Sequence, residues 1–247
     1  LPTAALIASR GFRVVGYDTN AEIVSTINHG RVHIVEADLD GLVQKVVGNQ
    51  TLRASTEPCS ADVFLIAVPT PLGPDKSPDL SYVFEAARAI APFLKKGDIV
   101  ILESTSQVGT TEAISELLAD ERPDLALPTR SGESADVSVA YCPERILPGR
   151  VLAELVSNER CIGGISPRCA RRAQRFYSGF VRGVCFRTTA RTAELVKLAE
   201  NAFRDTNIAF ANELALVCED EDQQAGARPG DQQEKRHGDQ RPGDRRH

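Results

Sequence analysis

Short apolar runs rich in β-branched residues alternate with helical patterns along most of this chain, and this alternation limits its possible folds more than any other feature. The runs are too short for helices and are apolar on both sides, as in a sheet that helices cover on both faces. We therefore predict a doubly wound parallel sheet of the α/β class. The predicted strands cover residues 12–17, 62–68, 98–102, 137–141 and 184–188, and helices are expected at 21–28, 80–94, 110–118 and 167–180.

Both ends of this alternating pattern are unusual. Residues 2–10 predict a helix that Gly11 ends, and the strand that should precede this helix is missing from the pattern. Residues 192–218 carry apolar side chains at three- and four-residue intervals, which predicts a long helix. Residues 220–247 contain two alanines as their only apolar residues apart from proline, so they are not expected to form a core.

Composition and charge argue against several classes of function. The formal net charge is −5 with acidic and basic residues interspersed, so no basic stripe is expected to bind nucleic acid. No run of ~18 apolar residues predicts a membrane span, and the first residues lack the pattern of a signal peptide, so we expect a cytoplasmic protein. The six cysteines include no C-x-x-C pair and only four histidines accompany them, so no metal site is predicted.

A strand that ends in an acidic residue gives the first candidate binding site. Asp18 follows the strand at residues 12–17, ~20 residues after the place where a glycine-rich phosphate loop would lie. A carboxylate there can accept hydrogen bonds from both ribose hydroxyls of NAD, and it repels the additional phosphate of NADP. The alternative is that Asp18 only caps the following helix, and the local pattern does not separate the two.

Two further strands run into turns that could contact a cofactor. The strand at 62–68 ends in a proline-stiffened turn, at the edge where doubly wound sheets bind ligands. The strand at 98–102 continues into a hydroxyl-rich segment that begins a helix, which could bind an anion or could simply provide N-capping residues. The candidate cofactor contacts in these turns are Val68, Pro69, Thr70, Pro71, Ser104 and Thr105.

Two groups of polar residues could carry catalysis. Glu144 comes just after the strand at 137–141 and could orient a water or accept a proton, although a solvated pair with Arg145 is the commoner case. Lys197 and Asn201 lie one turn apart on the predicted long helix and could stabilise a developing oxyanion. A charged stripe that faces solvent would show the same spacing, which also includes Glu194, Arg204 and Asn212.

Together and in this order, the segments resemble the UDP-glucose and UDP-N-acetylmannosamine dehydrogenase family over almost the whole of residues 1–219. Within the family, the segments at 33–39, 101–106 and 209–214 look closest to the branch that oxidises UDP-N-acetyl-D-mannosamine. The resemblance implies a Rossmann-like doubly wound sheet whose first strand is missing here. It also implies NAD as the cofactor, a UDP-sugar as the substrate and a homodimer formed through the long helix.

The family oxidises a sugar alcohol to an aldehyde and then, through an enzyme thioester, to a carboxylate, with reduction of two NAD. By this resemblance, Asp18 would bind the adenosine ribose, and the two turns described above would line the cofactor. Glu144 would assist hydrolysis of the thioester. Lys197 and Asn201 would stabilise the alkoxide and oxyanion intermediates, and Thr105 would serve both the cofactor and catalysis.

Two departures from the family pattern bear on activity. The glycine-rich phosphate loop is expected before Leu1, and the nucleophilic cysteine, in a Gly-Gly-x-Cys segment, is expected after the long helix, but the sequence contains neither. A thioester cannot form without that thiolate. We therefore expect an inactive fragment of an enzyme of polysaccharide-precursor synthesis. The alternatives are a UDP-glucose or UDP-N-acetylglucosamine 6-dehydrogenase, and a non-catalytic dimerising remnant.

The expected organisation has three parts. Residues 1–190 would form a truncated NAD-binding domain, and residues 191–219 the start of a central dimerisation helix. Residues 220–247 would be a disordered tail, either a functional low-complexity segment or coding sequence read out of frame. The abrupt change of composition inside a helical pattern favours the out-of-frame interpretation.

Overall fold

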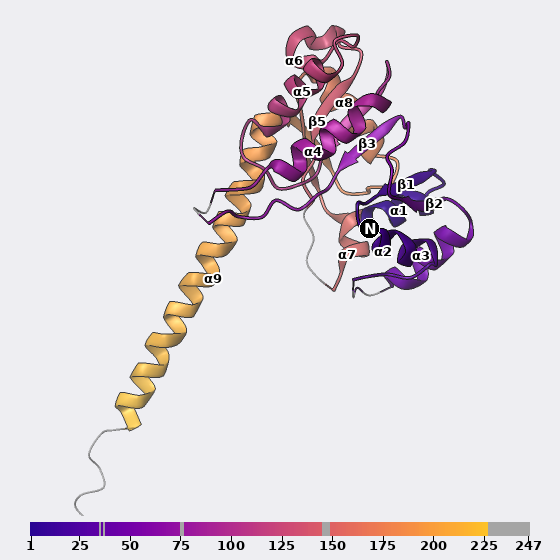
Figure 1. Ribbon diagram of the computed structural model, residues 1–247. Coiled ribbons are helices and arrows are strands. Elements are labelled where there is room, and N and C mark those ends of the chain that lie inside the picture. The colour runs from indigo at the N-terminus through magenta and orange to yellow at the C-terminus, as the bar shows by residue number, and fades with distance from the viewer. Residues whose placement is uncertain (35, 37, 75–76, 145–148, 227–247) are drawn as a thin grey trace, which may run out of the picture. The chain divides into compact units, whose positions relative to one another are not determined.

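A computed structural model of the chain describes residues 1–34, 36, 38–74, 77–144 and 149–226, with side chains described only to residue 219 in the last helix (Figure 1). The chain divides into two compact units, Leu1–Ala199 and Glu200–His247. Among the described residues, all strands lie in the first unit. The described part of the second unit is the continuation of the last helix.

The strands of the described residues form two sheets, and the predicted doubly wound α/β fold is confirmed. A two-stranded parallel sheet pairs β1 with β2, and a five-stranded sheet has the order β3-β4-β5-β6-β7. Within the second sheet one pair departs from the predicted parallel arrangement, because β6 runs antiparallel to β5. The strands are β1 (Val14–Tyr17), β2 (Leu52–Ser55), β3 (Val63–Ile66), β4 (Ile99–Leu102), β5 (Ser138–Tyr141), β6 (Arg160–Gly164) and β7 (Cys185–Thr189).

Two of these strands, β2 and β6, were not predicted. β2 is four residues long and buries only alternate side chains, with Leu52 and Ala54 inside and Arg53 exposed, so its apolar signal is weak. β6 begins with a charged residue and ends in Gly163 and Gly164. A Cβ atom on either glycine would clash with neighbouring backbone, so the two glycines allow helices to pack directly against the strand.

The helices at residues 2–10, 21–28, 80–94, 110–118, 167–180 and 192–218 were predicted, and each is present with somewhat different bounds. The last helix continues past the predicted boundary at residue 219, and residues 227–247 of the predicted tail lie outside the described residues. The α-helices are α1 (Pro2–Ser9), α2 (Ala21–Asn28), α3 (Leu39–Gly48), α4 (Ser81–Ile90), α5 (Thr110–Glu121), α6 (Pro128–Ser131), α7 (Val151–Ser157), α8 (Pro167–Tyr177) and α9 (Ala190–Gly226).

Helices cover both faces of the five-stranded sheet, as the apolar strands require. Successive side chains of a strand point to opposite faces. Val100 and Leu102 of β4 accordingly pack in one core with α4 and α5. Ile99 and Ile101 pack in a second core with α1, α7 and α8. A third core joins α1 and α3 to β2.

The two sheets do not join, because β1 and β3 form no ladder with each other. Both strands nevertheless border the same core, because Val14 of β1 and Val63 and Leu65 of β3 are partly buried against the cluster that contains Ile99 and Ile101. In the 3-2-1-4-5-6 order of doubly wound sheets, the first strand lies at this break. The break therefore agrees with the prediction that the first strand is missing from the pattern.

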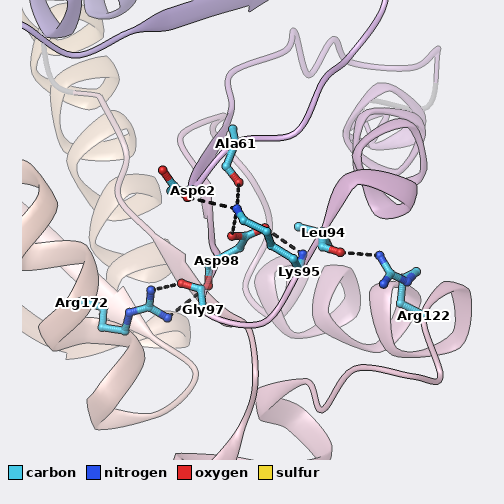
Figure 2. Close-up of polar contacts among 8 residues, drawn as sticks. All are labelled: Ala61, Asp62, Leu94, Lys95, Gly97, Asp98, Arg122 and Arg172. Carbon is cyan, nitrogen blue, oxygen red and sulfur yellow. Dashed lines mark hydrogen bonds and ion pairs between the residues drawn. The ribbon is translucent and has the colours of Figure 1, made fainter.

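Polar contacts fasten the amino end of the five-stranded sheet, where β3 and β4 begin (Figure 2). Lys95 Nζ donates to Asp62 Oδ1 at 3.0 Å, to Asp98 Oδ1 at 2.7 Å and to Ala61 O at 3.0 Å. The backbone N–H of Lys95 also donates to Asp98 Oδ2 at 2.9 Å. The turn before β4 is thus tied to the residues before β3, and buried Asp98 has a donor on each of its oxygens.

Two arginines extend this network to the neighbouring helices (Figure 2). Arg172 of α8 donates to the carbonyl oxygens of Gly97 and Asp98. Arg122, just after α5, donates to Leu94 O at 2.6 Å. These bonds use carbonyl groups that a turn would otherwise leave to solvent, and they fix α8 and the end of α5 to the start of β4.

Candidate functional site

The predicted cofactor turns meet at the carboxyl end of β3 and β4. Ser104 Oγ donates to Val68 O at 2.7 Å, and Thr70 Oγ1 donates to Thr105 O at 2.8 Å. Each turn therefore supplies one hydroxyl donor to the backbone of the other. Residues 35 and 36 positions apart in the sequence are held together, as the topology of adjacent parallel strands predicts.

Prolines limit the backbone freedom of the turn after β3. Pro69 and Pro71 have fixed φ angles and no backbone N–H, so neither can extend the strand. Pro71 O accepts a hydrogen bond from Asp79 N at 2.8 Å, which closes the segment ahead of α4. The turn is therefore positioned from both sides, by residues 104–105 and by Asp79.

Glu144 and Lys197, two of the predicted catalytic residues, lie in contact. Lys197 Nζ, on the early part of α9, donates to the backbone oxygen of Glu144 at 2.9 Å. The Glu144 side chain accepts from Thr3 Oγ1, in the first turn of α1, at 2.8 Å. Thr3 was not predicted, because the bond joins residues 141 positions apart and no local pattern marks it. Arg145, the alternative partner of Glu144, lies outside the described residues.

Asn201 belongs to the second unit, one helical turn beyond Lys197 on α9. The role assigned to Asn201 therefore stays a prediction.

Asp18 lies directly after β1, as predicted. Its backbone N–H continues the ladder to Ser55 O at 3.1 Å, and its Oδ1 accepts from Asn20 N at 2.8 Å. The N-cap of α2 is Asn20, whose side chain accepts from the N–H groups of Glu22 and Ile23. The capping alternative therefore belongs to Asn20. Asp18 Oδ2 accepts no hydrogen bond from the described part of the chain.

The start of α5, predicted as an anion site or a Ser/Thr cap, holds a carboxylate of the chain itself. Glu194 of α9 is fully buried, and its Oε2 accepts from Gly109 N at 2.6 Å. Its Oε1 accepts from the N–H of Thr111 at 2.8 Å and from Thr111 Oγ1 at 2.6 Å. These N–H donors are already used, so a cofactor phosphate is not expected to bind there.

A buried polar cluster lies beneath these turns, between β4, β5, β6 and α8. Tyr177 Oη donates to Glu103 Oε1 at 2.5 Å, and Arg160 lies over the Tyr177 ring with its Cζ atom 5.3 Å from the ring centroid. Arg160 is 2% exposed, and its Nε and Nη1 have no hydrogen-bond partner among the described residues. The cluster therefore contains a charge that hydrogen bonds only partly compensate.

Burial controls the acids and thiols of this cluster. It raises the pKa of Glu103 to about 7, against the opposing effects of the Tyr177 hydrogen bond and the Arg160 charge. Burial also raises the pKa of Cys142 to about 12, so this thiol stays protonated near neutral pH and is a poor nucleophile. Sequence patterns did not predict this cluster, because its members come from four separate parts of the chain.

Metal and membrane sites are not indicated within the described ranges. Their His, Cys, Asp and Glu side chains form no group of three or more that could ligate a metal ion. None of their helices combines the length and apolar character that a membrane span requires.

The fold is a doubly wound sheet with linked turns at its carboxyl edge, and a long helix brings a lysine to that edge. This arrangement is typical of the dinucleotide-binding α/β domains of dehydrogenases. Residues 1–181 match the NAD binding domain of the UDP-glucose/GDP-mannose dehydrogenase family, and residues 191–225 match the central domain of the same family. The chain belongs to this family of nucleotide-sugar dehydrogenases.

Relatives with high identity agree with this assignment. An NDP-N-acetyl-D-galactosaminuronic acid dehydrogenase from Ralstonia nicotianae is 60% identical over 220 residues, which are 89% of this chain and 52% of the relative. A UDP-N-acetyl-D-mannosamine dehydrogenase from Escherichia coli (strain K12) is 58% identical over 221 residues, 90% of this chain and 53% of the relative.

A solved structure of the same kind shares the fold. The UDP-D-ManNAc dehydrogenase from Pyrococcus horikoshii matches with a TM-score of 0.81 and 44% identity, over 87% of this chain and 50% of that chain. The chain thus spans about half the length of the relatives it matches.

Proposed function

We propose that the carboxyl edge of the sheet binds NAD, and that the whole protein uses NAD to oxidise UDP-N-acetyl-D-mannosamine to its uronic acid. The observation that carries this proposal is the contact between Lys197 Nζ and Glu144 O at 2.9 Å. It brings a cation from α9 to the loop after β5, beside the turns after β3 and β4. The names of the relatives from Escherichia coli and Pyrococcus horikoshii support the choice of sugar.

The residues at this edge fit NAD. Asp18 Oδ2 accepts nothing from the described residues, so it is available to a ribose hydroxyl, and its charge disfavours the additional phosphate of NADP. The turns at 68–71 and 104–105 already bond to each other, so they would offer a preorganised surface. Bound NAD would accept a hydride from the sugar carbon.

Lys197 and Glu144 would act on the sugar. The Lys197 ammonium stabilises the negative charge that develops on the alcohol oxygen as its proton leaves, because a fixed cation needs no reorganisation at that moment. The Glu144 carboxylate is oriented by Thr3 and would position the water that hydrolyses the thioester. Asn201 would add a neutral donor one turn further along α9, and Thr105 would contact both cofactor and substrate.

The second oxidation needs a thiolate that these residues do not supply. The sequence contains no Gly-Gly-x-Cys segment, and burial keeps Cys142 in its thiol form. We expect the 247 residues by themselves to be inactive, with the thiolate supplied by the part of the family's length that they do not match.

We also propose that α9 carries a homodimer interface in a cytoplasmic enzyme of polysaccharide-precursor synthesis. Phe203 and Phe210, in the second unit, are 72% and 63% exposed, and Leu216 and Val217 are exposed as well. Water is a poor solvent for a row of large apolar side chains, so a partner helix would stabilise them. Sedimentation velocity should show a dimer in wild type and a monomer after Phe203→Glu with Phe210→Glu.

The test of the catalytic proposal is a chimera. Residues 1–219 are joined to the segments that precede and follow the matched region in the relative from Escherichia coli, and NADH formation is followed by absorbance with one UDP-sugar at a time. We expect turnover with UDP-N-acetyl-D-mannosamine, and little with UDP-glucose or UDP-N-acetylglucosamine.

The matched control is the same chimera with Lys197→Met, which keeps the length of the side chain and removes its charge. Preference for UDP-glucose or UDP-N-acetylglucosamine would support the alternative substrates. A correctly folded dimer that forms no NADH with any of the three sugars would instead support the dimerising remnant.

A further inference from the structure

The Glu194 carboxylate is the most completely bonded acidic side chain at the carboxyl edge of the sheet. It is 0% exposed and accepts three hydrogen bonds, from Gly109 N, Thr111 N and Thr111 Oγ1, at 2.6 to 2.8 Å. Thr111 is itself fully buried. All three distances are those of good hydrogen bonds.

The contact completes a helix end that has no cap of its own. α5 begins after Gly109, which has a φ of 101° and no side chain to accept the first N–H groups. Such groups must find a partner when they are buried, and a negative charge there also interacts favourably with the helix dipole. Glu194 supplies both the hydrogen-bond acceptor and the negative charge, although it lies on a different helix, 83 residues after Thr111.

Each helix of this pair continues from a part of the proposed site. α5 follows the turn that contains Ser104 and Thr105, and this turn is bonded to Val68 and Thr70. α9 carries Lys197, three residues after Glu194, which is close to one turn of helix. A translation of α9 along its axis, or a rotation about that axis, would therefore break the Glu194 contacts and displace Lys197 at the same time.

We infer that Glu194 is a positioning residue, which fixes the first turns of α9 to the start of α5 and thereby holds Lys197 at the loop after β5. The meaning of this for catalysis rests on the proposed function, whereas the linkage between the two helices does not. The buried Glu194 carboxylate then links the cofactor turn and the lysine, so that they move as parts of one unit.

A second contact between the same helices is too exposed to hold α9 firmly against α5. Arg191 Nη1 donates to Glu112 Oε2 at 2.8 Å, but the two side chains are 59% and 39% exposed. Exposed ion pairs hold their partners weakly, because water competes for both charges. Arg191→Gln is therefore a matched control, since it breaks an ionic contact between α5 and α9 and leaves the Glu194 contacts intact.

The experiment measures Lys197 directly in the 247-residue chain. Lysine side chains are labelled with an acylating reagent at low temperature, and mass spectrometry gives the rate at each site, with hydrogen exchange followed at Gly109 and Thr111. For Glu194→Gln we expect exchange at these amides to rise roughly tenfold or more, and labelling of Lys197 to rise with it. Labelling of Lys95, at the opposite end of the sheet, should stay at the wild-type rate. Arg191→Gln should resemble wild type at all of these sites.

Thr111→Val keeps the proposal testable if Glu194→Gln does not fold, because it removes one of the three bonds and preserves the shape of the side chain. It should raise Lys197 labelling by a smaller factor. Unchanged Lys197 labelling in a folded Glu194→Gln protein, or an equal rise at Lys95, would overturn the inference. If the chimera forms no NADH while the labelling result stands, the proposed function fails and the linkage does not.

Discussion

Two buried acidic residues lie at the opposite ends of β4, and their hydrogen-bond partners differ in charge. Asp98 precedes the strand and is 1% exposed, and both of its oxygens accept hydrogen bonds from Lys95. Glu103 follows the strand and is 7% exposed, and its carboxylate accepts a hydrogen bond from the hydroxyl of Tyr177. One acid has a cation in direct contact, and the other has a neutral donor.

This difference distinguishes the amino end of the sheet, where polar side chains stabilise the fold, from the carboxyl end, to which we assign the function. At the amino end, lysine and arginine side chains donate hydrogen bonds to the carboxylate and carbonyl oxygens around the turn before β4, so these acceptors need no ligand (Figure 2). At the carboxyl end, burial raises the pKa of Glu103 to about 7, and Nε and Nη1 of Arg160 have no hydrogen-bond partner among the residues that the structure describes. Perturbed groups of this kind gather at functional sites, and here they lie beneath the proposed cofactor turns.

The largest effect that would sharpen this comparison is on turnover. In the chimera, Lys197→Ala should reduce turnover ~10²-fold or more, because the cation that stabilises the alkoxide is lost. Lys96→Ala is the control at the amino end, where Nζ of exposed Lys96 lies 3.4 Å from Asp136 Oδ1, and it should leave turnover unchanged. Steady-state NADH formation measures both. Equal turnover in wild type and Lys197→Ala would support the alternative that Lys197 belongs to a charged stripe with no catalytic role.

The next effect is on the pH dependence of stability. The pKa of Glu103 is raised from 4.5 to about 7 by burial, so the folded state holds this proton more tightly than the unfolded state. The resulting stabilisation is fully present below pH 4.5 and is lost as the pH rises to about 7. Glu103→Gln resembles the protonated acid, so its advantage over wild type should grow across this interval by up to about 3 kcal/mol.

Urea denaturation at a series of pH values between 4 and 8 measures this difference. Glu133→Gln, an exposed acid on the same unit, should shift stability by a constant amount or not at all. If the difference between Glu103→Gln and wild type is flat across the range, the carboxyl end is as well compensated as the amino end, and the comparison fails.

A smaller effect is expected at the amino end. Asp98→Ala removes the acceptor that Lys95 uses twice, and should lower the free energy of unfolding by about 1.5–3 kcal/mol. Asp62, whose side chain is 93% exposed, also accepts from Lys95, and Asp62→Ala should change stability by less than about 1 kcal/mol. Neither variant should change the NAD affinity of the chimera. A loss of NAD binding in folded Asp98→Ala would show that the two ends are not independent.

Local patterns were enough to predict most of the strands and the turns that follow them. The runs before Asp18, Val68, Ser104 and Glu144 are apolar on both faces, so their ends identified the carboxyl edge of the sheet without any structure. The family resemblance, and not periodicity, assigned catalytic roles to Lys197 and Glu144, but it did not predict the contact between Lys197 Nζ and the Glu144 backbone oxygen.

Contacts between distant segments could not be predicted in this way. Glu194 looked like one more polar residue on a helical stripe, because its spacing from Lys197 does not indicate a contact with Thr111, 83 residues earlier in the chain. Thr3 and Arg160 carry no local signal either. β6 was missed for a related reason, since a strand that begins with a buried arginine and ends in two glycines has a pattern that only its packing explains.

The most direct test of the account is the choice of cofactor at Asp18. Equilibrium titration of the chimera with NAD and with NADP measures both dissociation constants, in wild type and in Asp18→Ala. The account predicts that wild type binds NAD at least ~10-fold more tightly than NADP, and that Asp18→Ala loses most of this preference, because the carboxylate both accepts from the ribose and repels the phosphate. Equal affinities in wild type, or an unchanged preference in Asp18→Ala, would contradict the assignment of the carboxyl edge to NAD.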